Sequence, residues 1–91
     1  MKTHAVLVAD RTRPLTTMGP AVSSAAASGC ERIAIDIDGL PDFDVPAVRQ
    51  LIRLLRIAHD GGTNVALHVA SADRRRALAE MGLDRVFAIV A

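Results

Sequence analysis

Short apolar runs alternate with longer segments of mixed polarity along this chain. The runs are rich in Val, Ile and Ala and only a few residues long, which is typical of strands in a sheet. They occupy residues 5–9, 33–37, 65–70 and 86–90. The first run is continuously apolar, so we expect a strand that is buried on both faces.

Segments between these runs favour helices. Residues 16–28 are rich in Ala and end before Gly29, which suits a C-terminal cap. Residues 72–81 follow Ser71, a good N-terminal cap, and are followed by Gly82. Both segments are therefore predicted to be short helices.

The predicted helix between them has the clearest pattern. Pro46 suits its first turn, Asp44 suits its N-terminal cap, and Gly61 ends it. Apolar side chains form one stripe at helical spacing: Val48, Leu51, Ile52, Leu55 and Ala58. Basic side chains form another: Arg49, Arg53 and Arg56. We expect the residues that flank the apolar stripe to be less than fully buried: Gln50, Leu54 and Ile57.

This order of elements predicts the fold class. Strands that alternate with helices imply right-handed crossovers and a largely parallel sheet. We predict an α/β fold, a small open and mostly parallel sheet of about four strands with three helices packed on it. The order is β-α-β-α-β-α-β, in a single domain of residues 1–91.

Composition narrows the function. The 91 residues are 51% hydrophobic but only 2% aromatic, and the net charge is +1. With few rings to stack on bases and little attraction for phosphates, no nucleic-acid partner is expected. No apolar run approaches the roughly 20 residues that span a bilayer, so we expect no direct membrane insertion and a cytoplasmic location. Cys30 is alone, which excludes an intramolecular disulfide and favours a structural thiol.

Two groups of charged residues are candidates for chemistry. Four carboxylates lie close together in sequence: Asp36, Asp38, Asp42 and Asp44. They could bind a cation such as Mg²⁺, but strand-end and capping roles are the favoured interpretation. Six arginines lie in two predicted helices: Arg49, Arg53 and Arg56 in the second, and Arg74, Arg75 and Arg76 at the start of the last. A solvated surface is favoured for them, and docking of an acidic protein surface is the alternative. No nucleophile, base and acid can be assembled from the histidines, so no catalysis and no cofactor are expected.

Three stretches of the chain resemble STAS domains, the fold of sulfate transporters and anti-sigma factor antagonists. Residues 31–39 resemble the family's strand that ends in Asp, a hydrophobic residue, a polar residue and Gly. Residues 42–51 are similar to the turn into its second helix, and residues 79–87 resemble its ending. The resemblance covers residues 30–91 well and residues 5–29 in outline.

The chain departs from the family where phosphorylation-regulated members are modified. Asp44 holds the family's Asp position, but the modified Ser is replaced by Val45, and Pro46 and Ala47 follow it. A phosphoryl group cannot be placed on these side chains, so we expect the phosphorylation switch to be absent. The resemblance carries the family's partner-binding region to six residues: Asp44, Val45, Pro46, Arg49, Gln50 and Arg53.

The resemblance also implies a surface left uncovered. There is little room before residue 5 for the family's extra strand and none after residue 91 for its closing helix. An exposed sheet face or edge favours association with a partner or a second copy, so a homodimer is one expectation.

The function implied by the resemblance is a non-catalytic protein-interaction module similar to an anti-sigma factor antagonist, without the Ser switch. Its partner would be an anti-sigma factor or a kinase-like regulator. The alternative is a small STAS-type subunit of a membrane transport complex for sulfate or lipid. A third hypothesis is a small enzyme or metal-binding protein that uses the carboxylates of residues 36–44.

Overall fold

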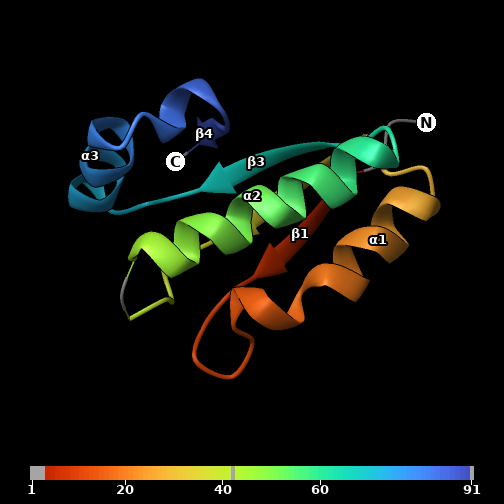
Figure 1. The fold of residues 1–91 in the computed structure, drawn as a ribbon, viewed down its shortest axis with the longest axis horizontal. Coiled ribbons are helices and arrows are strands. Elements are labelled where there is room, and N and C mark those ends of the chain that lie inside the picture. Colours follow the sequence, from red (N-terminus) through yellow and green to blue (C-terminus); the bar gives the residue numbers. More distant parts are fainter. Residues whose placement is uncertain (1–3, 42, 91) are drawn as a thin grey trace.

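The computed structural model describes residues 4–41 and 43–90, and it contains the predicted alternation of strands and helices (Figure 1). The strands are β1 (His4–Val8), β2 (Arg32–Asp36), β3 (Asn64–His68) and β4 (Ala88–Val90). The helices are α1 (Gly19–Ala27), α2 (Val45–Asp60) and α3 (Ala72–Glu80). Two 3-10 turns, η1 (Leu15–Thr17) and η2 (Leu83–Arg85), precede α1 and β4. The predicted order β-α-β-α-β-α-β is confirmed.

All strand pairs are parallel, and the spatial order β1-β2-β3-β4 follows the sequence order. Each strand therefore pairs with the next through a helical crossover, and crossovers of one hand place their helices on one face of the sheet. Figure 1 shows α1 and α2 side by side over that face. The predicted small, open, parallel sheet is confirmed.

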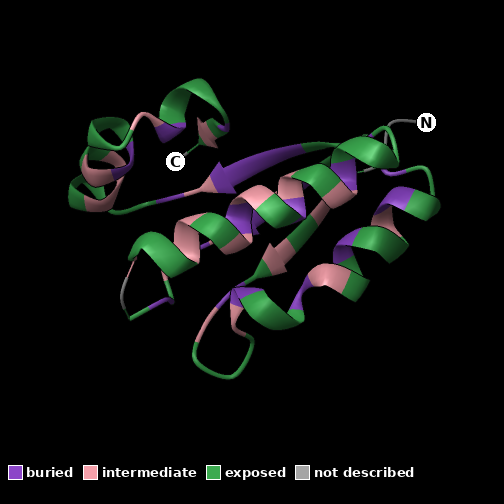
Figure 2. Cartoon of the chain, in the orientation of Figure 1, coloured by how far each residue is buried: buried purple, intermediate pink, exposed green. Residues whose placement is uncertain are grey.

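One hydrophobic core lies between the sheet and its helices. The residues of β2 and β3 that alternate toward the helices are buried. Figure 2 shows β3 largely buried and exposed residues along α2. The core combines sheet residues with residues of all three helices and of both turns. Its largest fully buried apolar side chains are Ile33, Ile35, Ile37, Leu51, Leu54, Leu67 and Leu78.

The prediction that the first strand is buried on both faces is wrong. Burial alternates along β1, and Val6 is 68% and Val8 45% exposed. The reason is the strand order: with sequential parallel neighbours, the helices cover one face only. An apolar run that is typical of a doubly covered strand here has one covered and one open side.

Two element boundaries also differ from the pattern. Residues 16–28 are not one helix, because the chain makes η1 first and α1 then begins at Gly19 with Pro20 in its first turn. Residues 86–90 are not one strand, since η2 extends to Arg85 and only the last three of the described residues pair with β3. The buried Phe87 belongs to the core ahead of that strand.

The second helix has the predicted bounds, but its buried stripe lies slightly to one side. Leu54, expected to be partly exposed, is only 2% exposed, whereas Ile52 is half-buried. Gln50 and Ile57 are half-buried as predicted. Among the residues that the structure describes, no helix has both the length and the apolar character needed to cross a bilayer.

Candidate protein-interaction site

The start of α2 is held by a side-chain cap. The Asp44 carboxylate accepts a hydrogen bond from the Ala47 amide at 3.0 Å, and Pro46 lies in the first turn, where no amide hydrogen is required. This confirms Asp44 as the predicted cap. Because the cap fixes the backbone, Val45 is presented to solvent with 65% of its surface exposed.

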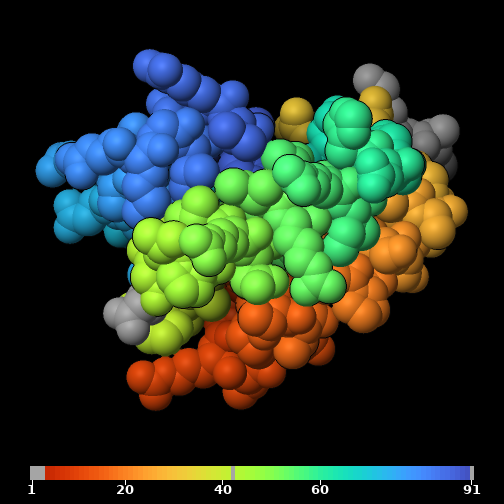
Figure 3. Space-filling view, in the orientation of Figure 1, coloured from red at the N-terminus to blue at the C-terminus, as the bar shows by residue number. Residues whose placement is uncertain are grey.

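An apolar pocket of about 390 Å³ lies beside this helix start. Three segments far apart in sequence form it: the connection from β1 to α1, the loop after β2, and the first two turns of α2. In Figure 3 the first segment, in red and orange, lies directly against the start of α2, in yellow-green. The lining residues are Asp10, Arg11, Pro14, Leu15, Thr16, Leu40, Pro41, Pro46, Ala47 and Gln50.

The pocket follows from the topology. The carboxyl ends of β1 and β2 lie at the same edge of the parallel sheet, and the loops that leave them surround the helix start. Ligand sites of open α/β sheets form at this edge. The fold therefore places the predicted partner-binding helix next to a concave surface that no single stretch of sequence encodes.

Gln50, which lines the pocket, has a buried hydrogen-bond acceptor. Its side-chain oxygen Oε1 is buried and has no hydrogen-bond partner among the described residues. A buried amide oxygen without a donor costs free energy, on the order of 1–3 kcal/mol. Because Gln50 also lines the pocket, a bound molecule that brings an N–H or O–H group would recover that free energy once the side chain turns its oxygen toward the pocket.

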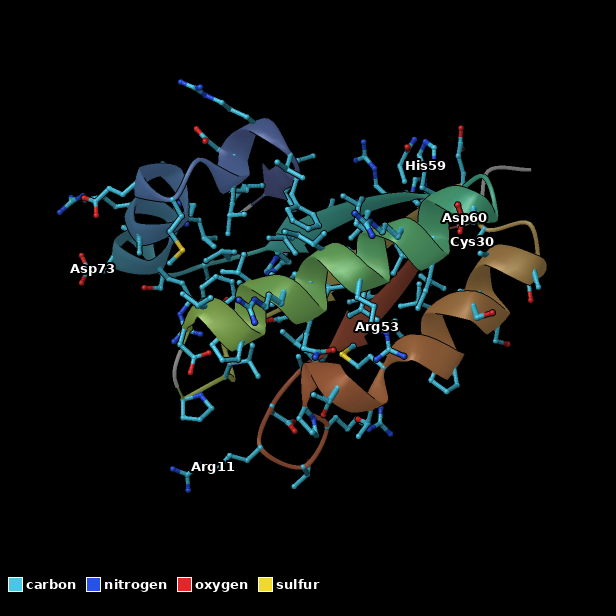
Figure 4. All side chains as sticks on the ribbon, in the orientation of Figure 1. Arg11, Cys30, Arg53, His59, Asp60 and Asp73 are labelled. Carbon is cyan, nitrogen blue, oxygen red and sulfur yellow. The ribbon has the colours of Figure 1, made fainter. Side chains whose placement is uncertain are left out.

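The rim of the pocket is ordered by Asp10. Its Oδ1 atom accepts hydrogen bonds from the amides of Thr12 and Arg13, at 2.9 and 2.8 Å, and from the Thr12 hydroxyl at 2.7 Å. The Thr12 hydroxyl, followed by the Arg13 amide, holds the pKa of Asp10 below its ordinary value. The turn that carries Arg11 is thereby fixed, and the Arg11 side chain projects away from the body of the protein (Figure 4).

A second, smaller groove lies along α2. It has a volume of about 310 Å³, and Arg53, which projects from the middle of the helix, is one of its basic residues (Figure 4). The other lining residues are Arg49, Ile52, Arg56, Ile57 and Asp60. Apolar stems between guanidinium groups make this groove suited to an acidic, partly apolar partner surface.

Five of the six predicted partner-binding residues are exposed at the start of α2 or along it, and the sixth, Gln50, is half-buried. Pro46 and Gln50 line the pocket, Arg49 and Arg53 line the groove, and Asp44 and Val45 lie at the helix start. Sequence reasoning missed the other wall of the pocket. Those residues follow the predicted first and second strands, and the rule that loops at carboxyl strand ends meet at one edge would have indicated them. They are Asp10, Arg11, Pro14, Leu15, Thr16, Leu40 and Pro41.

The predicted acidic cluster is only partly assembled. Ligand atoms of Asp36, Asp38 and His68 lie within 4.8 Å of one another, at the ends of β2 and β3. Asp42 lies outside the described residues, and Asp44 caps α2. Two carboxylates and an imidazole are a donor set that a divalent cation can use.

Hydrogen bonds already occupy most of these carboxylate oxygens. Asp36 Oδ1 accepts from the Asp38 amide at 3.0 Å, while the Asp38 oxygens accept from the Ala70 amide at 2.7 Å and the Ser71 amide at 3.3 Å. The Ala70 hydrogen bond above all holds the pKa of Asp38 below its ordinary value. Asp36 Oδ2 lies 3.8 Å from His68 Nδ1. These contacts give the carboxylates the strand-end roles that the sequence favoured.

The arginines at the start of α3 also bind within the fold. Arg74 donates from Nη1 to the Ile37 carbonyl at 2.6 Å, and Arg75 donates from Nη1 to the carbonyls of Val69 and Ala70, each at 2.8 Å. These bonds compensate for placing positive charge at a helix N-terminus. Two of the three arginines in this group therefore connect α3 to the ends of β2 and β3.

The single thiol is buried as a structural residue. Cys30 is 7% exposed, and its Sγ atom lies 3.1 Å from the Arg32 carbonyl oxygen, to which it donates. The Cys30 carbonyl in turn accepts a hydrogen bond from the buried Thr63 hydroxyl at 2.7 Å. These contacts join the beginning of β2 to the turn before β3.

Comparison with known proteins assigns the family. A family model described as "Mlab, STAS domain" matches residues 11–91, nearly the whole chain. No curated protein matches the sequence. STAS domains generally mediate protein–protein interactions and are not catalytic. The match extends the resemblance of residues 30–91 back into the first connection, which forms one wall of the pocket. On its sequence match and its parallel sheet with three helices, the chain belongs to the STAS domain family.

Proposed function

We propose that this protein is a non-catalytic interaction module, similar to an anti-sigma factor antagonist, whose partner docks at the start of α2. The observation that carries the proposal is the apolar pocket with the buried, unpartnered Gln50 Oε1 atom. An apolar wall and one orphaned acceptor complement a partner segment that inserts an apolar side chain and donates one hydrogen bond. Burial of one such side chain contributes about 1.5–3 kcal/mol.

Charge around the pocket defines the partner further. Arg11 stands at its rim, and Arg49 and Arg53 are exposed along α2. Guanidinium groups bind carboxylates through paired hydrogen bonds. The docking segment is therefore an apolar side chain flanked by acidic residues, on a cytoplasmic partner of the anti-sigma factor or kinase-like class.

The contact is constitutive in this proposal. Val45, Pro46 and Ala47 have no hydroxyl group on which a kinase could place a phosphoryl group. Without that charge there is no switch at this position to release the partner. Incubation with ATP and a cell extract should leave residues 44–47 unmodified, and mass spectrometry of the recovered protein checks this.

The same observation favours a second candidate function, a small subunit of a membrane transport complex for sulfate or lipid. A permanent subunit needs a binding surface without a release switch, and the exposed Val45 beside an apolar pocket meets that requirement. In this case the partner would be a transporter ATPase or permease. The docking residues would be the same six, Asp44 to Arg53.

A matched set of variants tests the docking site. Gln50→Leu keeps the side-chain volume but removes the acceptor, and Arg11→Glu reverses an exposed rim charge without touching the core. We expect each variant to weaken capture of the partner by about tenfold or more, since the orphaned acceptor or the charge pairing is lost. Glu80→Gln, at the exposed end of α3, is the control and should bind normally.

The experiment is a native pull-down from the source cells with wild-type and variant bait, followed by mass spectrometry. A partner that is lost with both pocket variants and kept with the control supports the proposal. A partner bound equally by all four proteins contradicts it. The identity of the captured partner separates the two candidate functions. A sigma-factor regulator supports the anti-sigma factor antagonist-like module, and a transporter ATPase or permease supports the transport-complex subunit.

A further inference from the structure

The face of the sheet opposite α1 and α2 has no helix over it among the residues that the structure describes. Alternate residues of each strand point to this open face, because their neighbours point into the core. Val6, Val8 and Val90 are 68%, 45% and 38% exposed there. The residues on this side of the strands are His4, Val6, Val8, Arg32, Ala34, Asp36, Asn64, Ala66, His68, Ala88 and Val90. All of them are exposed or half-buried except Ala66, which is 1% exposed.

The register arranges these side chains in three rows across the strands. The middle row contains Val6 and three alanines, at positions 34, 66 and 88. The row at the strand starts contains Arg32, and the row at the strand ends contains Asp36. Along β2 the two charges therefore stand at equal spacing on either side of Ala34.

This arrangement is complementary to itself. A two-fold axis that crosses the strands at the middle row would lay β2 of one copy antiparallel on β2 of the other. Arg32 of each copy would then face Asp36 of its partner, twice over, and Val6 would face Val6. In the middle row Ala34 is half-buried and Ala88 is exposed, whereas Ala66 is already buried, so Val6, Ala34 and Ala88 are the residues that a second sheet would contact. We propose that a second copy of this chain covers the open face, as a two-fold dimer held by these contacts.

The physical chemistry of parallel sheets supports a cover of this kind. Such sheets are almost always buried on both faces, whereas here the exposed valines lie on a face without helices. The charges fit a second copy better than an apolar ligand, because an apolar ligand would desolvate the Arg32 guanidinium without offering it a carboxylate. Asp36 of a second copy, which also accepts a hydrogen bond from the Asp38 amide of its own chain, offers one. In the dimer, the same step that buries the valines pairs the charges.

The size of the open face sets the strength of the dimer. Five residues at about 3.3 Å and four strands at about 4.8 Å give roughly 300 Å² of sheet in each copy. Stable interfaces bury about 800 Å² per partner, so this dimer is weak and depends on concentration. It is independent of the proposed docking function, because the pocket beside α2 lies on the helix-covered side of the sheet and stays accessible.

Charge reversal in separate chains tests the arrangement. In the Arg32→Glu protein each Glu would face Asp36 of the partner, and in the Asp36→Lys protein each Lys would face Arg32. We expect each variant alone to dimerise at least about tenfold more weakly than wild type. A mixture of the two restores both opposite-charge contacts, so the heterodimer should regain wild-type strength. Sedimentation velocity from micromolar to millimolar concentration at low salt measures each case.

A second pair protects the test against a folding defect, since Asp36 also accepts the Asp38 amide. Val6 is exposed and faces itself in the proposed dimer. Val6→Glu and Val6→Lys should each be monomeric and should associate when mixed. Arg53→Glu, on the helix side, should leave the dimer unchanged. Thermal unfolding monitors the fold of every variant.

Three results would overturn the proposal. The first is a wild-type protein that remains monomeric over the whole concentration range. The second is a dimer that persists in Arg32→Glu and Val6→Glu, which would place the contact on another surface. The third is a pair of folded charge variants that fail to associate when mixed, which would exclude this two-fold arrangement.

Discussion

Asp38 stabilises the turn that follows β3 through its carboxylate. Its two oxygens accept the amides of Ala70 and Ser71, just ahead of α3. Because the hydrogen bonds favour the ionised form, the pKa of Asp38 lies below its ordinary value of 3.8. The stabilisation is therefore complete above pH 3.8, declines as the pH falls toward the lower folded-state pKa, and is absent below it.

Replacement of this carboxylate by an amide gives a prediction with a pH dependence. Asp38→Asn leaves one acceptor oxygen and turns an NH₂ group toward a backbone amide. We expect the free energy of unfolding at neutral pH to fall by about 1 kcal/mol, a value already reduced for solvent screening. The difference from wild type should vanish as the pH falls well below 3.8. Urea denaturation of both proteins over a pH series measures it.

Asp60→Asn, at the exposed end of α2, is the matched control and should unfold like wild type at every pH. A difference between wild type and Asp38→Asn that persists unchanged into strong acid would contradict the prediction, because a protonated Asp38 no longer accepts both amides as a carboxylate.

At this scale the sequence predicts what is local. Asp44 and Ser71 were predicted as helix caps, and both accept the expected amide, because a cap needs only its own helix. Asp38 accepts hydrogen bonds from Ala70 and Ser71, which lie more than 30 positions further along the chain. These bonds, like the burial of Gln50 Oε1, depend on how distant segments pack together. No pattern within one segment contains that information.

At the scale of elements, the buried stripe of α2 has the predicted helical spacing but lies slightly to one side of its predicted position. Leu51 and Ala58 are buried as predicted, but Leu54 replaces Ile52 at the centre of the stripe. Both residues are apolar, so the sequence alone gives either a place in the stripe. The choice depends on tertiary packing, in which α1 lies against α2 and Leu54 joins the hydrophobic core.

The ends of α1 and α2 are in unusually close contact. Gly61 follows α2, and a Cβ atom at this position would lie 2.6 Å from the Ala26 Cβ atom of α1. The φ angle of Gly61 is −89°, which any residue can adopt, so only the contact requires glycine here. We expect Gly61→Ala to destabilise the protein by about 1–3 kcal/mol through overpacking. The additional Ala26→Gly substitution should recover most of that loss.

Gly62→Ala separates this effect from backbone strain. Gly62 has a φ angle of +79°, and a Cβ atom at this position would have no other atom within 4 Å. We therefore expect Gly62→Ala to lower the free energy of unfolding by about 1 kcal/mol through its backbone conformation alone. Ala26→Gly should not rescue it. Thermal or urea denaturation of the five proteins measures both effects. Equal rescue of the two alanine variants would show that the helix contact does not explain the glycine.

At the scale of the whole molecule, the sequence predicts the order of elements and the parallel sheet, since alternating strands and helices leave few topologies. It does not predict which face each strand exposes. The apolar pattern of residues 5–9 predicts a strand that is buried on both faces. β1 is instead exposed on one face, because the sequential strand order places the helices on the other. The pocket was missed for a related reason: its walls meet only once the sheet has formed.

The strand order also predicts how stability is distributed. β2 and β3 have a paired strand on both sides, whereas β4 pairs only with β3, over three described residues. Local opening requires least free energy where the fewest contacts are lost. We expect native-state hydrogen exchange at Ile37, whose amide bonds to the His68 carbonyl, to be at least about tenfold slower than at Val69, whose amide bonds to Val90. The Ile37 amide should exchange only with global unfolding.

Hydrogen exchange measured by NMR at increasing denaturant concentration separates local opening from global unfolding. Exchange at Val69 should depend weakly on denaturant, and exchange at Ile37 strongly. Equal dependence at both amides would mean that β4 opens only when the central strands do, despite having a single neighbour.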